Sequence, residues 1–334
     1  LWHNAFRDQV DLNLGEIQDL LVLNMRACML VESLAQEAHF YDNLIAGEQE
    51  ALRLSSLVGP NLLNIPVNPD FDGGLMFLDD PPPVITLGSM VVHVIGPTTA
   101  ELTDLRDEWN RWVTENQNKV QRIRDQARED AERLHEDEGT VLQTATLTLA
   151  AELQQEAAEL GDRSGVTPPN LASLMLLVEE DGKSILLTGD GHADDIRHGL
   201  IAHSKINEET GIHLDVLKVQ HHGAEYNLDR TFGQYVTADH YVFCANGSHD
   251  NPNLDVLKAI MESRLGPEAA ESKSPGVGRP FALWFNSSSV AANTASRRKH
   301  MEQVEEWVAA QSQACQGQMQ FHFLTDASLF EITV

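Results

Sequence analysis

The sequence predicts an α/β protein in which a sheet and helices form separate layers, and two observations carry this prediction. From residue 173 onward, short apolar runs typical of strands alternate with longer stretches of helical spacing. Earlier, residues 84–97 combine a high density of β-branched residues with a glycine-containing turn, which is typical of a strand pair. At 334 residues, the chain is long enough for one large elaborated domain or for two smaller ones.

The N-terminal half predicts helices on either side of that strand pair. Residues 14–57 contain few helix breakers and place leucines at helical spacing, so we expect two or more helices there. Residues 59–83 are rich in Gly and Pro and predict turns. Residues 99–161 lack proline and are dense in Glu, Arg, Gln and Ala, which predicts a long helical hairpin inserted between strands. This hairpin is either a solvated helix pair without chemistry, or a substrate lid or partner-docking arm.

The C-terminal half predicts alternating strands and helices. Strands are expected at 173–179, 184–188, 214–219, 241–245, 281–285 and 329–334. Helices are expected near 192–204, 228–235, 253–263 and 294–311. These assignments divide the chain into an N-terminal part of a sheet domain (1–98), a helical insertion (99–161) and the C-terminal half of the same domain (162–334).

The charge balance restricts the classes of partner. The chain carries 23 basic and 51 acidic side chains, a net charge of −28, which argues against non-specific wrapping of DNA or RNA. It does not exclude nucleic acid at a metal centre, because bound cations reverse the local field. No apolar run approaches the length of a membrane span, and the N-terminus does not have the layout of a signal peptide. We therefore expect a cytoplasmic protein without a membrane partner.

The first candidate site is Asp190, which follows an apolar strand between Gly189 and Gly191. The glycines let the backbone turn tightly and leave the carboxylate at the sheet edge, where it could bind one or two divalent metal ions. The alternative is that Asp190 is a helix N-cap, a common use of aspartate after a strand.

The second candidate site is the doublet His221-His222, which also follows a strand and precedes Gly223. Neutral imidazole is the commonest nitrogen ligand of zinc. Adjacent residues of an extended chain face opposite ways, so we expect one of the two to be a metal ligand or proton donor and the other to orient or pack. The alternative is a pair of surface or satisfied histidines.

The third candidate site is His249, on a loop that leaves a further strand and contains the turn dipeptides Asn246-Gly247 and Asn251-Pro252. Functional groups of α/β proteins gather at strand ends. Because the three sites each follow a strand within one short stretch of chain, we expect Asp190, the histidine doublet and His249 to converge.

Four motifs together resemble the C-terminal half of the metallo-β-lactamase-fold domain in ComEC-type DNA-internalisation proteins and their stand-alone relatives. They are Asn170-x-x-Ser173, Leu187-Thr188-Gly189-Asp190, Leu217-Lys218-Val219-x-His221-His222-Gly223 and Asn246-Gly247-x-His249. The likeness covers residues 83–98 and 168–262. It implies an αββα sandwich with a hydrolytic site for two metal ions, Zn²⁺ or Mn²⁺. By this resemblance Asp190 matches the metal-bridging aspartate, His221 and His222 the post-strand motif, and His249 the late-loop histidine.

The chain departs from the family pattern at two points. No HxHxDH-type motif occurs before residue 100, where His3, His39 and His93 stand isolated. In addition, Asn251 occupies a position where relatives often have histidine. Either the motif lies upstream in a longer native protein, or the site is degenerate; the opening phrase without Met favours the first alternative.

The resulting hypothesis is a metal-dependent phosphodiesterase or nuclease in which two metal ions activate water. His221 and His222 are the catalytic candidates, and Asp190, His222 and His249 are the candidate metal ligands. The expected partners are nucleic acid or another phosphodiester, and a protein partner or processing protease. Two alternatives remain: a catalytically incomplete lactamase-like scaffold that acts as an interaction or regulatory protein, and a small-molecule ester hydrolase.

Overall fold

A computed structural model describes residues 1, 2, 4, 63–115, 168–325 and 329–334. The chain forms two compact units. The first comprises Leu1–Met76 and Ala100–Pro169, and the second comprises Phe77–Thr99 and Asn170–Val334. The second unit contains all eight strands of the sheet, together with every candidate site residue.

The described part of the first unit is a short N-terminal segment with a turn and a helix. The Leu1 carbonyl accepts a hydrogen bond from the Asn68 amide (2.8 Å), and the Trp2 indole donates to Asp70 (3.0 Å) in the 3₁₀ turn η1 (Pro69–Phe71). Helix α5 (Thr99–Glu115) accounts for the first part of the helical hairpin predicted over 99–161. The helices predicted over 14–57 and the rest of that hairpin lie outside the described residues.

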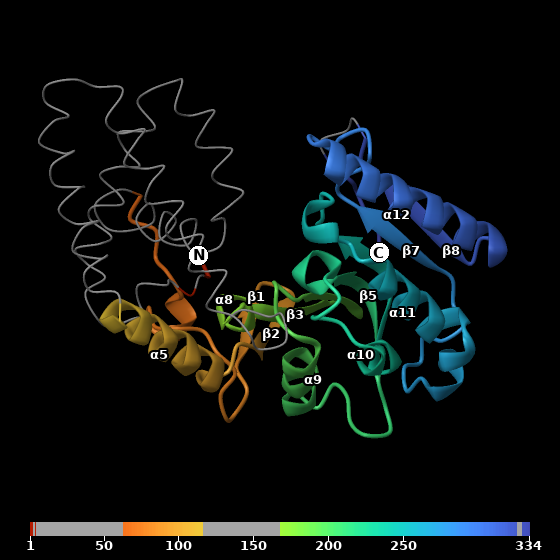
Figure 1. Ribbon diagram of the computed structural model, residues 1–334. Helices are drawn as coiled ribbons and strands as arrows, with labels where there is room; N and C mark the ends of the chain where they lie inside the picture. The colour runs from red at the N-terminus through yellow and green to blue at the C-terminus, as the bar shows by residue number, and fades with distance from the viewer. Residues whose placement is uncertain (3, 5–62, 116–167, 326–328) are drawn as a thin grey trace, which may run out of the picture. The chain divides into compact units, whose positions relative to one another are not determined.

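The sheet of the second unit has eight strands in chain order (Figure 1). They are β1 (Val84–Leu87), β2 (Met90–Gly96), β3 (Met175–Glu180), β4 (Lys183–Leu187), β5 (Ile212–Lys218), β6 (Val236–Phe243), β7 (Phe281–Phe285) and β8 (Met319–Phe323). Strands β1 to β4 pair antiparallel, and β4 to β8 pair parallel. The predicted α/β class is confirmed.

Helices connect the parallel strands, and their first turns are capped by side chains. The α-helices are α8 (Pro168–Leu171), α9 (Ala193–Ala202), α10 (Arg230–Tyr235), α11 (Leu254–Leu265) and α12 (Ala295–Ala314), and the 3₁₀ turns are η2 (Gln220–Gly223), η3 (Ser248–Asp250) and η4 (Pro267–Glu271). The N-cap side chains His192, Asp229, Asn253 and Thr294 each accept a hydrogen bond from a backbone amide of the first turn. Such caps satisfy amides that have no partner within the helix. The four helices predicted in this half are confirmed.

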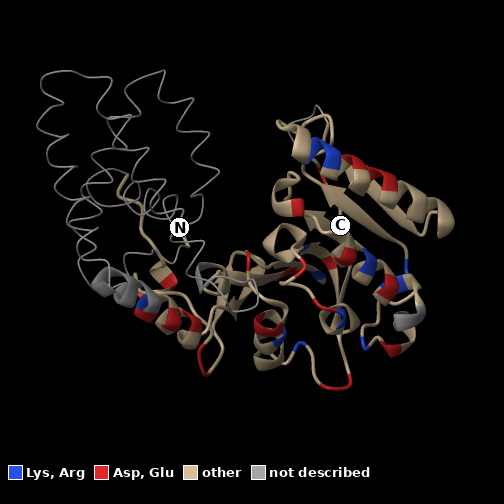
Figure 2. Ribbon diagram, viewed as in Figure 1, with Lys and Arg blue, Asp and Glu red and all other residues tan. Residues whose placement is uncertain are grey.

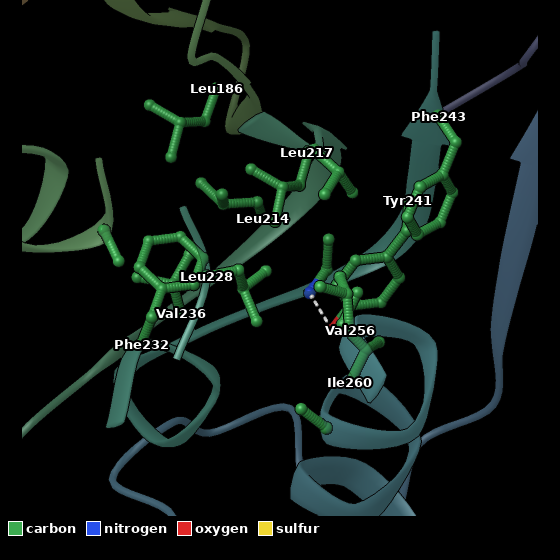
Figure 3. Packing of buried hydrophobic residues seen from close by; sticks show 14 of the residues in the cluster. Leu186, Leu214, Leu217, Leu228, Phe232, Val236, Tyr241, Phe243, Val256 and Ile260 are labelled. Carbon is green, nitrogen blue, oxygen red and sulfur yellow. Dashed lines mark hydrogen bonds between the residues drawn. The ribbon is translucent and has the colours of Figure 1, made fainter. Parts of the chain in front are cut away.

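The helices pack against one face of the sheet. Leu186, Leu217, Tyr241 and Leu283 stand in register on four neighbouring strands, and all four are buried in one core cluster. Figure 3 shows Leu186, Leu217 and Tyr241 within this cluster. The same cluster takes Ile196 from α9, Phe232 from α10, Ile260 from α11 and Val304 from α12. This arrangement is expected, because right-handed crossovers between strands in sequential order place every connecting helix on the same side.

The next residue of each strand points to the opposite face, because side chains alternate along a strand. Leu187, Lys218, Val242 and Trp284 form this second row in register. Leu187 is exposed and the other three are half-buried. Lys218, at the carboxyl end of β5, is the charged member of this row.

The final strand of the sheet differs from the one predicted. Leu329–Val334 has no strand pairing, and β8 at Met319–Phe323 is the last strand instead. Met319–Phe323 follows the C-terminus of α12 after a short turn at Gly317, so it is the first apolar segment that reaches the edge of β7. The later segment contributes Phe330, whose ring lies edge-on against Trp284 with centroids 5.3 Å apart.

Charge is unevenly distributed along α12. In Figure 2 the ribbon of α12 is coloured for basic residues at its start and for acidic residues in the turns that follow. The basic residues are Arg297, Arg298 and Lys299, and the acidic ones are Glu302, Glu305 and Glu306. The helix dipole is already positive at the N-terminus, so these basic residues add to the positive potential beside the η3 loop, which α12 contacts.

Within the described part of the chain, no helix combines the length and the apolar character needed to cross a membrane.

Candidate functional site

The predicted site residues follow three adjacent parallel strands. Asp190 comes after β4, His221 and His222 come after β5, and His249 comes after β6. Since these strands pair side by side in parallel, their carboxyl ends lie at one edge of the sheet. The predicted placement of the three loops at neighbouring strand ends is therefore confirmed.

The backbone of the loop after β4 fixes the position of Asp190. Gly189 has a φ of +54°, and a Cβ on it would lie 2.8 Å from the Cβ of Ser173, so a side chain is excluded there. The amide of Asp190 donates to the hydroxyl of Ser173 (3.1 Å). The N-cap of α9 is His192, whose Nδ1 accepts from the Asp194 amide (3.2 Å). The alternative of Asp190 as a helix N-cap is thus excluded, and its carboxylate is available for other contacts.

The histidine doublet adopts an uncommon backbone conformation. His221 and His222 have φ values of +43° and +60°, in the left-handed region. Each such residue carries strain of order 1–3 kcal/mol, and strain of this kind clusters at functional sites. The expectation that the two side chains alternate along an extended chain is wrong, because both residues lie within η2. The turn is held by the His221 amide, which donates to the Gly189 carbonyl (3.2 Å).

His222 presents a ring nitrogen to Asp190. Its Nδ1 lies 2.6 Å from the carbonyl oxygen of Cys244, and a carbonyl only accepts, so Nδ1 carries the proton and donates. In the neutral ring, Nε2 then holds a lone pair, and this atom lies 3.8 Å from Oδ2 of Asp190. Two acceptors therefore face each other at a distance too long for a hydrogen bond.

Lys218 occupies the other side of the same carboxylate. Its ammonium lies 3.6 Å from Oδ1 of Asp190 and donates a hydrogen bond to the carbonyl of Gly189. Asp190 therefore lies between a fixed positive charge and the Nε2 of His222. The lysine and aspartate side chains are one fifth and one third exposed, so solvent only partly screens their interaction.

His221 is the more enclosed histidine of the doublet. Its Nδ1 lies 2.7 Å from Oδ1 of Asn227, and its Nε2 lies 3.4 Å from Nδ2 of Asn170. Burial lowers the pKa of His221 below its ordinary value; the hydrogen bond with Asn227 and the charge of Asp190 oppose this shift without reversing it. The ring is therefore neutral near pH 7.

His249 is placed differently from the other candidates. It lies in η3, is exposed, and has a φ of +54°. Among the residues that the structure describes, no three or more His, Cys, Asp and Glu side chains are grouped so that they could hold a metal ion. The structure brings Asp190, His221 and His222 together, and a ligand role for His249 stays a prediction.

The pair Asp190 and His222 fits part of a divalent-cation site. Carboxylate oxygen and neutral imidazole nitrogen are both ligands of Zn²⁺ and Mn²⁺. The carbonyl of Cys244 bonds the non-ligating nitrogen of His222, which is the usual way in which a metal-binding histidine is oriented. The described residues thus offer two groups whose chemistry suits a divalent cation, and their role as ligands stays a prediction.

Sequence reasoning missed Asn227 and noted Lys218 only as a member of a motif. Lys218 could have been assigned to the site, because it is a charged residue near the end of the mostly apolar strand predicted over 214–219. Asn227 could not, since it lies in the segment Ala224–Asp229, which has no motif and no periodicity. Ser173 was noted only as part of a motif, and its hydroxyl supports the Asp190 loop.

Comparison of the chain with protein-family models, with curated proteins and with solved structures gave no match.

Proposed function

We propose that this protein is a metal-dependent hydrolase of phosphodiesters, and that Asp190 and His222 contribute ligands to its metal site. The single observation that carries the proposal is the 3.8 Å approach of the His222 Nε2 lone pair to the Asp190 carboxylate.

Two lone pairs at this separation are mutually repulsive unless a positive charge lies between them. A proton on His222 Nε2 would relieve the repulsion, but 3.8 Å exceeds the 2.7–3.2 Å of an N–H···O hydrogen bond. The separation is shorter than two metal–ligand bonds of about 2.1 Å placed end to end. A divalent cation therefore suits the two groups better than a shared proton does.

The surroundings favour an anionic substrate over a neutral ester. Lys218 and the basic first turn of α12 are positive groups beside the loops of this edge, in a chain whose net charge is −28. Arg297 also bonds the η3 loop through the hydroxyl of Ser248 (3.2 Å). These positively charged side chains are suited to binding phosphate oxygens.

The roles of the chain's own groups follow from their protonation. A divalent cation held by Asp190 and His222 would supply Lewis-acid activation of the nucleophile and neutralise charge on the phosphate. His221, neutral with a lone pair on Nε2, accepts a proton. Lys218 orients an anionic group and holds the Asp190 loop through the carbonyl of Gly189.

In this proposal, the second unit forms part of a metallo-β-lactamase-like αββα sandwich. Its helices lie on one face of the sheet, as in one half of such a sandwich. The opposite face carries the apolar side chains Leu187, Val242 and Trp284, which suits packing against a second sheet.

The test is hydrolysis by the full chain loaded with Zn²⁺ or Mn²⁺. The substrates are bis(p-nitrophenyl) phosphate, single-stranded DNA, plasmid and RNA. We expect turnover that a chelator abolishes, and that Asp190→Asn abolishes with the fold intact. The control Asp107→Asn, a carboxylate that is 61% exposed, should leave the rate unchanged.

Two results would contradict the proposal. One is full activity of the Asp190→Asn variant. The other is absence of turnover on every phosphodiester, which would favour the interaction scaffold, or the small-molecule ester hydrolase if a neutral ester is cleaved.

A further inference from the structure

Asn227 joins the loop of Asp190 to the loop of the histidine doublet. It is fully buried and lies in the connection between η2 and α10. We propose that Asn227 is a positioning residue that fixes His221 in the Nδ1–H form, so that Nε2 of His221 is the proton acceptor of the ring. The catalytic consequence rests on the proposed function, whereas the tautomer itself does not.

The orientation of the Asn227 amide is set by its partners. Nδ2 lies 3.0 Å from the carbonyl oxygen of Asp190 and 3.1 Å from that of Gly191. Both partners only accept, so the atom that faces them must be the NH₂ group, which has two protons to donate. The opposite orientation would place three oxygens together without a proton between them. Oδ1 of Asn227 therefore faces His221.

This orientation decides where the His221 proton lies. Oδ1 of Asn227 can only accept, and it lies 2.7 Å from Nδ1 of His221, so Nδ1 must donate. In the neutral ring, Nε2 is then the acceptor. The environment of Nε2 agrees, because Nδ2 of Asn170, a donor, lies 3.4 Å from it.

The main chain of Asn227 reinforces the connection. Its carbonyl accepts from the Ala193 amide at the start of α9 (3.0 Å) and from the side-chain amide of Gln220 (3.0 Å). One residue thus bonds the β4–α9 loop and the η2 turn through both its backbone and its side chain. Removing only the side chain separates the positioning role from the backbone contacts.

A purely structural role makes a different prediction. If Asn227 only satisfied the carbonyls of Asp190 and Gly191, its loss would lower stability without changing the protonated nitrogen of His221. The proposed role requires that the tautomer itself change. The state of the ring is therefore the readout that separates the two roles.

The experiment is a long-range ¹H–¹⁵N spectrum of the full chain labelled with ¹⁵N-histidine, at a fixed pH at which the ring is neutral. The His221 signals are assigned by their loss in His221→Gln. We expect a protonated Nδ1 and an unprotonated Nε2 in the wild type. In Asn227→Leu we expect a species with protonated Nε2, whereas the control Asn207→Leu, which removes a turn-capping amide, should keep the wild-type pattern.

Kinetics give the second readout. For a group that orients a ligand or base, we expect kcat to fall about tenfold or more in Asn227→Leu, with KM nearly unchanged. A protonated Nε2 in wild-type His221 would overturn the proposal. This result needs no variant, so the proposal can be tested even if Asn227→Leu does not fold. An unchanged tautomer in folded Asn227→Leu overturns it too. If the wild type cleaves no phosphodiester, the proposed function fails, and the tautomer still decides the role of Asn227.

Discussion

Replacing Lys218 by methionine removes the positive charge that competes with a cation for Asp190. The ammonium of Lys218 lies 3.6 Å from Oδ1 of Asp190, and Nε2 of His222 lies 3.8 Å from Oδ2 of the same carboxylate. A divalent ion bound by Asp190 and His222 must therefore share the carboxylate with this lysine. The variant should consequently bind divalent metal more tightly than the wild type does.

The size of the effect follows from the distance and the exposure. Two unit charges 4 Å apart interact by about 1 kcal/mol in water and by about 4 kcal/mol at an effective dielectric constant of 20. Because the two side chains are one fifth and one third exposed, the lower half of this range applies. We expect a gain of about 1.4 kcal/mol or more, which corresponds to a Kd about tenfold lower.

The assay is isothermal titration calorimetry with Zn²⁺ and with Mn²⁺ at low ionic strength. Lys183→Met is the matched control, since Lys183 lies 3.2 Å from Asp215, an ion pair away from the doublet. The control should leave Kd unchanged, and added salt should narrow the difference between Lys218→Met and the wild type. Equal or weaker metal binding by Lys218→Met would refute the assignment of the cation to Asp190.

Three further predictions concern stability. In Gly199→Ala, the new Cβ of α9 would lie 2.0 Å from the Ile95 carbonyl oxygen, so urea denaturation should show a net loss of about 2 kcal/mol despite the better helix propensity. Leu217→Ala removes a fully buried side chain and should lower the free energy of unfolding by about 2–5 kcal/mol in the same assay. Burial by itself raises the pKa of Glu179, but hydrogen bonds from Lys205 and His93 outweigh it and hold the pKa below the ordinary 4.5. The stability that Glu179 contributes is therefore complete above pH 4.5 and is lost as pH falls through the folded pKa. Glu179→Gln should consequently have a lower Tm than the wild type at neutral pH, and its Tm should fall less steeply as the pH is lowered.

The sequence predicted the second unit well where apolar pattern and turn residues agree. The hairpins β1–β2 and β3–β4 each follow from two β-branched or aliphatic runs around a turn that contains Gly88 or Gly182. The helices after β4, β5, β6 and β7 follow from their spacing. These elements depend on local chemistry, which a single sequence contains.

Strand β6 shows where local pattern is insufficient. The prediction covered only 241–245, because polar residues precede Tyr241, whereas the strand begins at Val236. Thr237 and Asp239 both bond the His213 ring (2.8 and 3.0 Å), and His240 accepts from the Trp284 indole (3.1 Å). Partners on neighbouring strands thus stabilise polar residues in this strand, and no local pattern contains those partners.

The candidate site was likewise predictable from the sequence only in part. The strand-end positions of Asp190 and the doublet were predictable from apolar runs that end at glycine-rich turns. The ring tautomers were not, because they depend on the Cys244 carbonyl and the Asn227 amide, which lie 22 and 6 residues away along the chain. The left-handed conformation of both histidines was also unpredictable, since it depends on packing of η2 against the loop of Gly189.

The most direct test of a metal held between Asp190 and His222 is the Zn²⁺ Kd of four proteins measured by calorimetry: wild type, Asp190→Asn, His222→Gln and His198→Gln. His198 is an exposed histidine of α9 and serves as the matched control. We predict that Asp190→Asn and His222→Gln each raise the Kd about tenfold or more, and that His198→Gln leaves the Kd unchanged. Equal Kd values for all four proteins would contradict the account.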